Sequence, residues 1–158
     1  MKKLYCFSLT IILLTISTKG LQAQTNLVPN PSFEDTLQCP TNDQSNNPNL
    51  CVGWTSYRGT PDYFNSCANG GVWGVPSNLL GYQNAYHGMA YTGLFTYDPF
   101  NYREFIGTQL MQPLLIGTKY YVSAYISRND SIPGSPSTCS NNNFGFRFST
   151  APYSFSNP

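Results

Sequence analysis

Apolar residues in this chain recur at every second position, in short runs that Gly, Pro and Asn interrupt. This alternation is typical of β-strands with one buried face, and no stretch shows the 3.6-residue period of an amphipathic helix. In the clearest run, residues 119–127 (KYYVSAYIS), the apolar side chains stand at Tyr120, Val122, Ala124 and Ile126. The pattern predicts a strand here, after a turn at Gly117.

Five further runs predict strands, and loops rich in Asn, Ser and Pro lie between several of them. They are residues 26–35, 51–57, 89–97, 103–110 and 143–149. Strands spaced by turn residues without helices predict an all-β fold, a β-sandwich or jelly roll. Nothing after residue 149 returns to cover the last strand, and soluble proteins avoid open edges. We therefore expect a sandwich that is incomplete at its C-terminus, with its final strands missing.

The first 23 residues have the pattern of a signal peptide. Lys2 and Lys3 precede an apolar run over residues 4–16, and Ala23 supplies a small residue for cleavage. The run is shorter than the roughly 20 apolar residues of a membrane span, so no transmembrane segment is expected in the mature chain. Residues 24–158 are then one exported module in the periplasm, on the outer-membrane surface or outside the cell.

Charge narrows the possible partners of this module. Cleavage removes three of the eight Lys and Arg residues and leaves five against seven acidic residues, a formal balance of −2. Nucleic-acid binding needs a basic face, so we expect no nucleic-acid partner. Abundant Asn, Ser, Thr and Gly with 15% aromatic residues fit an extracellular module that binds a glycan or another cell-surface polymer.

Four cysteines remain in the mature chain: Cys39, Cys51, Cys67 and Cys139. An even number in an exported protein indicates disulfides, and four cysteines allow three connectivities. Zinc is the competing interpretation, but the chain has no C-x-x-C motif and its single histidine, His87, is not at ligand spacing.

Residues 60–67 (TPDYFNSC) pose the choice between a reactive site and a structural corner. Asp62 has no visible catalytic partner, and Cys67 has no thiolate-stabilising base beside it. No G-x-S-x-G elbow accompanies His87, and nothing among the seven mature acidic residues favours a pair of glycosidase carboxylates. We expect a non-catalytic protein in which Pro61 and Asp62 form a turn and Cys67 fixes the loop.

Exposed aromatic rings that stack on sugar C–H faces make carbohydrate binding the better-supported function. Trp73, in the glycine-rich loop NGGVWGVP, is the best exposed candidate, and the others are Tyr91, Tyr97 and Tyr102. The competing interpretation places these rings in the core of the sandwich. Glu34 is a candidate ligand for a structural Ca²⁺, although a solvated turn explains it equally simply; no other cofactor is expected.

Several segments resemble a known family. NLVPNPSFED (residues 26–35), followed by Gly53-Trp54, resembles the opening of galactose-binding-like jelly-roll domains, which include many carbohydrate-binding modules. The run over residues 112–127 is similar to a hairpin of these domains. TPDYFNSC, GVPSNLLGYQ, GMAYTGLFTY and YREFIGTQL are together similar to surface proteins of Bacteroidetes, where such a module often precedes an OmpA-like or type IX secretion sorting domain.

The resemblance implies a non-catalytic cell-surface module that binds carbohydrate. The alternative is a structural or adhesive domain of an OmpA-like or type IX-secreted protein with no sugar ligand. The resemblance also implies a disulfide between Cys39 and Cys67, which leaves Cys51 to pair with Cys139. Glu34 matches the early Ca²⁺ position of some relatives, but the late acidic ligand of those relatives is missing from this sequence.

Overall fold

A computed structural model describes residues 25–41, 48–68, 71–96, 100, 102–128 and 144–151. The signal peptide predicted for residues 1–23 lies outside this part. Within it the regular elements are strands and two 3₁₀ helices, η1 (Pro48–Leu50) and η2 (Ser66–Ala68), with no α-helix. No helix among the described residues is long and apolar enough to span a membrane. The all-β prediction is therefore confirmed at the level of fold class.

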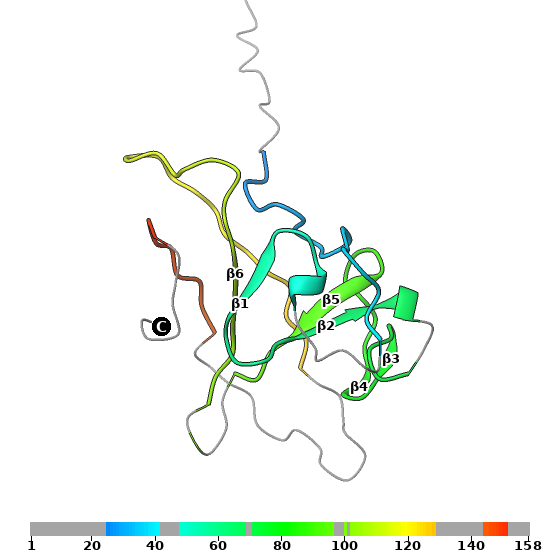
Figure 1. The fold of residues 1–158 in the computed structure, drawn as a ribbon. Coiled ribbons are helices and arrows are strands. Elements are labelled where there is room, and N and C mark those ends of the chain that lie inside the picture. The colour runs from blue at the N-terminus through cyan, green and yellow to red at the C-terminus, as the bar shows by residue number, and fades with distance from the viewer. Residues whose placement is uncertain are drawn as a thin grey trace, which may run out of the picture.

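The strands pair as three antiparallel ribbons (Figure 1). The first ribbon pairs β1 (Trp54–Arg58) with β6 (Phe105–Thr108), and the second pairs β2 (Asp62–Asn65) with β5 (Ala90–Gly93). The third is a short hairpin of β3 (Ser77–Asn78) and β4 (Gly81–Tyr82). Strands predicted within residues 51–57, 89–97 and 103–110 are confirmed as β1, β5 and β6.

The core lies around β2 and β5. Tyr63 and Phe64 are both at most 1% exposed, although they are neighbours whose side chains leave the strand in opposite directions. Tyr63 belongs to a buried cluster with Cys51 and Ala90, against which Phe33, Leu50 and Trp54 pack. On the other side of β2, the Phe64 ring contacts Trp73 and Tyr91. The strand β2 therefore has apolar packing on both faces, which buries all four of its residues.

The turn predicted at Pro61 and Asp62 is wrong, because Asp62 already pairs with Gly93 as the first residue of β2. The predicted disulfide is confirmed: Cys39 and Cys67 are bonded, with their Cα atoms 5.7 Å apart and a sequence separation of 28. A closed loop of this length stabilises the fold by about 3 kcal/mol through the unfolded state. It joins the segment before η1 to η2, directly after β2.

Residues 26–35 do not form the predicted strand. Their main chain turns, with positive φ at Asn30 (43°) and Phe33 (63°), and the Phe33 amide donates to the Asn30 carbonyl at 3.1 Å. The Asn30 side chain holds this turn against the chain just before β1, because its Nδ2 donates to the carbonyls of Asp35 and Val52 at 3.0 Å each. Asparagine tolerates the left-handed conformation and bonds nearby main chain, so the turn follows from its chemistry.

Residues 119–127 and 144–149 are extended and exposed, but neither pairs with another described strand. Gly117 forms the predicted turn before the first of them, with φ of 80°. The Thr118 amide donates to the Leu115 carbonyl at 3.2 Å across this turn. Figure 1 shows the chain after β6 running away from the paired strands, turning and coming back.

Candidate functional site

Trp73 is buried, which corrects the prediction that its ring is exposed. The side chain is 8% exposed, and its ring lies 5.8 Å from Phe64, centroid to centroid. The loop that carries Trp73 is tied to β2, since the Asn65 amide donates to the Trp73 carbonyl at 3.1 Å. Its indole Nε1 has no partner among the described residues. Trp73 therefore fills the core beside Phe64 and presents no face to a ligand.

The other aromatic residues chosen from the sequence do not converge on one site. Tyr91 packs on Phe64 with 5.1 Å between centroids, and its hydroxyl accepts a hydrogen bond from Asn78 Nδ2. Burial raises the pKa of the Tyr91 hydroxyl. The Tyr102 hydroxyl donates to Glu104 Oε1 at 3.0 Å. Tyr97 lies outside the described residues. The hydroxyl groups of Tyr91 and Tyr102 are thus hydrogen-bonded to other residues of the fold.

Glu34 uses its carboxylate as an anchor for β5. Oε1 accepts from the amides of Met89 at 2.9 Å and Ala90 at 3.1 Å, and Oε2 accepts from Met89 at 3.0 Å. The described residues contain no group of three or more His, Cys, Asp or Glu side chains that would hold a metal ion. Glu34 therefore has a complete structural role in joining the N-terminal turn to the start of β5.

Glu104 is a second carboxylate that binds main-chain amides, and it is 5% exposed. Its Oε1 accepts from the Thr60 amide at 2.9 Å, and its Oε2 accepts from the Phe95 amide at 2.8 Å. Together with the Tyr102 hydroxyl, these amides donate hydrogen bonds to the carboxylate, which a buried carboxylate needs to replace its lost hydration. Glu104 thus fixes the chain just before β2 and just after β5.

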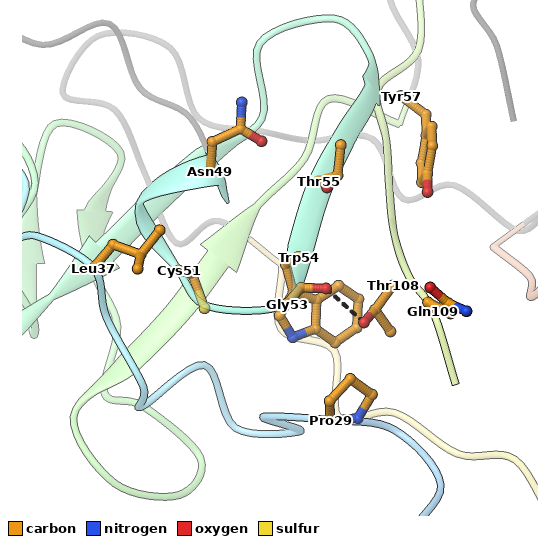
Figure 2. Close-up of a pocket in the computed structure, with 10 residues that line it drawn as sticks. All are labelled: Pro29, Leu37, Asn49, Cys51, Gly53, Trp54, Thr55, Tyr57, Thr108 and Gln109. Atoms are coloured by element: carbon orange, nitrogen blue, oxygen red, sulfur yellow. Dashed lines mark hydrogen bonds between the residues drawn. The ribbon is translucent and has the colours of Figure 1, made fainter. Parts of the chain in front are cut away.

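A groove of about 510 Å³ opens beside the β1–β6 ribbon (Figure 2). None of the described residues that line it is charged. The lining residues are Pro29, Leu37, Asn49, Cys51, Gly53, Trp54, Thr55, Tyr57, Thr108 and Gln109. Figure 2 shows Leu37 and Cys51 at one end, Tyr57 and Gln109 at the other, and Trp54 between them. The groove thus combines two aromatic rings with amide and hydroxyl groups.

Trp54 is fixed at the base of this groove. Its indole Nε1 donates to the Asn30 carbonyl at 2.9 Å, and its ring lies 4.7 Å from Phe33, centroid to centroid. The floor beside it is fixed too, because Thr108 Oγ1 donates to the Gly53 carbonyl at 2.6 Å. A preformed aromatic floor of this kind does not need to be ordered when a ligand binds.

Tyr57 lies over β6, where Gly107 makes room for its ring. A Cβ atom on Gly107 would stand 2.5 Å from Cε2 of Tyr57 and 3.0 Å from Cδ2. The pairing of β1 with β6 shifts between Ser56 and Arg58, so Tyr57 sits at a bulge, a place where strands commonly redirect a side chain. The ring is half-buried and lies across the ribbon at the end of the groove.

Cys51, at the other end of the groove, is a free and buried thiol, 1% exposed. The structure therefore differs from the pairing with Cys139 that the resemblance implied; Cys139 itself lies outside the described residues. Desolvation, partly opposed by a hydrogen bond from Asn30 Nδ2, raises the pKa of the Cys51 thiol to about 12. The thiol therefore stays protonated at neutral pH and packs as a small apolar group.

In the sequence, Trp54 stood out only as part of a predicted strand and of the family resemblance, and nothing singled out Tyr57, Asn49 or Gln109. These residues meet only when β1 pairs with β6, some 50 positions later in the chain. Comparison of the chain with protein-family models, with curated proteins and with solved structures found no match.

Proposed function

We propose that this chain is a non-catalytic, exported cell-surface module that binds carbohydrate in the groove beside the β1–β6 ribbon. The observation that carries the proposal is the Tyr57 ring lying across Gly107, at the end of a groove whose described lining residues carry no charge. The ring is half-buried, and the part of it that lines the groove is the surface to which we assign sugar stacking. Asn49, Thr55 and Gln109 are exposed and supply amide and hydroxyl groups for sugar hydroxyls.

The ligand class follows from the lining. A charged sugar buried in this groove would lose hydration without finding an opposite charge, so we assign neutral polysaccharides. In the same proposal, the strands belong to a galactose-binding-like jelly roll on a surface protein of the Bacteroidetes type. Its location is the periplasm, the outer-membrane surface or the extracellular space. The resemblance of residues 26–35 and 112–127 supports this part.

Affinity electrophoresis in gels with dissolved neutral polysaccharides tests the function. We expect retardation by at least one polysaccharide, and Tyr57→Ala should weaken the binding about tenfold, in line with the roughly 1.4 kcal/mol of a lost aromatic contact. Tyr82→Ala is the matched control, because Tyr82 is 60% exposed and does not line the groove. Unchanged mobility in every gel, or equal effects of the two variants, would refute the proposal.

The second candidate is a structural or adhesive domain without a sugar ligand. One observation favours it: Trp73, Tyr91 and Tyr102 all serve the packing or hydrogen bonding of the fold. Such a domain would give no retardation by any polysaccharide while the protein remains folded, so the same experiment separates the two functions.

A further inference from the structure

Two tyrosines that are distant in sequence, Tyr86 and Tyr125, stack directly on each other. Tyr86 lies in the loop between β4 and β5, and Tyr125 lies in the segment after β6. Their ring centroids are 3.4 Å apart, and the ring planes are inclined by 14°. Carbon atoms in contact stand about 3.5–4.0 Å apart, so the two rings overlap with almost no sideways offset. The ring carbons of Tyr86 therefore face ring carbons of Tyr125.

The hydroxyl groups lie at the same end of this stack. A hydrogen-bonding interaction with the Tyr125 side chain is the main cause that raises the pKa of the Tyr86 hydroxyl, ahead of desolvation. Two stacked phenol rings whose hydroxyls interact must point in the same direction. The two carbons beside each hydroxyl, the Cε atoms, are therefore also neighbours across the stack.

Hydrogen bonds beside the stack hold the two segments together. The Gln83 amide donates to the Pro76 carbonyl at 2.8 Å, which fixes the loop just before Tyr86. Ser127 Oγ donates to Gln83 Oε1 at 2.6 Å, which ties the segment of Tyr125 to the same loop. The two rings are thus kept near each other by more than their own contact, and a reaction between them needs no encounter of separate molecules.

Both side chains can also move as a reaction between them requires. Tyr86 is 69% exposed and Tyr125 is 71% exposed. Exposed side chains change rotamer within picoseconds to nanoseconds. The rings can therefore turn from the stack into the edge-to-edge arrangement of two directly bonded rings, without a change in the main chain.

We propose that Tyr86 and Tyr125 are an oxidative cross-linking site, at which a peroxidase with hydrogen peroxide joins the two rings as dityrosine. Each phenol loses one electron and its hydroxyl proton and becomes a phenoxyl radical, whose unpaired electron is shared with the Cε carbons. The two radicals combine through a Cε–Cε bond, and each bonded carbon then passes its hydrogen back to the hydroxyl oxygen. Hydrogen peroxide takes up the two electrons and two protons and leaves as two molecules of water.

The cross-link holds the segment after β6 to the loop before β5 by a carbon–carbon bond. Reductants do not break such a bond, in contrast to the disulfide between Cys39 and Cys67. Neither tyrosine lines the groove beside the β1–β6 ribbon, so the cross-link and the binding of carbohydrate are separate properties.

Oxidation of dilute protein with a haem peroxidase and hydrogen peroxide tests the site. Dityrosine fluorescence should appear while the protein still migrates as a monomer on a denaturing gel. Trypsin cleaves after Arg58, Arg103, Lys119 and Arg128 and separates the two tyrosines. After reduction and digestion, mass spectrometry should find residues 59–103 joined to residues 120–128 with the loss of two hydrogen atoms.

Tyr86→Phe and Tyr125→Phe keep a ring in the stack but lack the hydroxyl from which the radical forms, so each should lose the cross-link. Tyr82→Phe and Tyr121→Phe are matched controls in the same two peptides and should keep it. Tyr82 is 60% exposed and Tyr121 is 84% exposed, but neither stacks on another ring among the described residues. Absence of this joined peptide, cross-links only between chains, or the same product in Tyr86→Phe or Tyr125→Phe would overturn the proposal.

Discussion

The Glu34 carboxylate occupies the space where a side chain on Gly88 would stand. A Cβ atom built on Gly88 would overlap the carboxyl group, and the main chain of Gly88 has a φ of 71°. This close approach lets Glu34 reach the Met89 amide at 2.9 Å. The missing side chain at Gly88 thus allows the Glu34 carboxylate to join the N-terminal turn to the start of β5.

Gly88→Ala should destabilise the protein by more than 2 kcal/mol, because it adds a steric overlap with Glu34 to the roughly 1 kcal/mol of left-handed strain. Urea denaturation measures this loss. Gly117→Ala is the matched control, since Gly117 has a φ of 80° but nothing within 4 Å of its Cβ position. Equal losses for the two variants would show that the overlap with Glu34 carries no energy.

Glu34→Ala should cost about 2 kcal/mol of stability, since it removes a charged acceptor from two main-chain amides. Asp35→Asn, at the exposed neighbouring position, should change the free energy of unfolding by less than about 0.5 kcal/mol.

The same variants test the Ca²⁺ role that the resemblance implied for Glu34. With its oxygens bonded to amides, we expect the melting temperature to be the same in EDTA and in millimolar Ca²⁺. A melting temperature that rises with Ca²⁺ in the natural protein, and not in Glu34→Ala, would instead identify Glu34 as a metal ligand.

The sequence pattern predicted the strands in which alternating apolar and polar residues coincide with pairing in the folded protein. β1, β5 and β6 lie within the predicted ranges. β2 was not predicted, because Pro61 and Asp62 are typical turn residues. Pairing of Asp62 with Gly93 overrides that local preference. Residues 26–35 show the opposite case, since their alternation predicted a strand while Asn30 favours a turn that Asp35 and Val52 stabilise.

The site was harder to predict than the fold class. Trp73 was expected to be exposed because its loop is rich in glycine, but the loop folds onto β2 and the ring packs on Phe64. Tyr57 lies in a strand whose own sequence gives no reason to expect its ring in a groove. The absence of a side chain at Gly107, across the ribbon, makes room for the ring there.

Burial of Cys51 should make stability fall at alkaline pH. The folded thiol has a pKa of about 12, above its ordinary value of 9.0, so below pH 9 both states are protonated and stability is complete. Above that pH only the unfolded state loses the proton, and the free energy of unfolding falls by up to about 1.4 kcal/mol per pH unit until pH reaches the folded pKa.

Urea denaturation between pH 8 and 10.5 measures this fall. Burial also raises the pKa values of Tyr63 and Tyr91. In Cys51→Ala the free energy of unfolding should therefore still fall at alkaline pH, but less steeply than in the natural protein. Iodoacetamide should label Cys51 only in the unfolded protein, and this labelling should need no reductant. Labelling that requires reductant would show that Cys51 is in a disulfide, as the resemblance implied.

Gly107→Ala should separate binding from stability. The three atoms nearest to the added Cβ all belong to the Tyr57 ring, and Gly107 has no positive φ, so we expect the ring to rotate away at a cost of about 1 kcal/mol. That rotation removes the flat face from the groove, and affinity for a retarding polysaccharide should fall about as far as in Tyr57→Ala. Ile106→Val, at the neighbouring position of β6, controls for general perturbation of the strand. A Gly107→Ala protein that binds as well as the natural one would show that ligand does not stack on Tyr57.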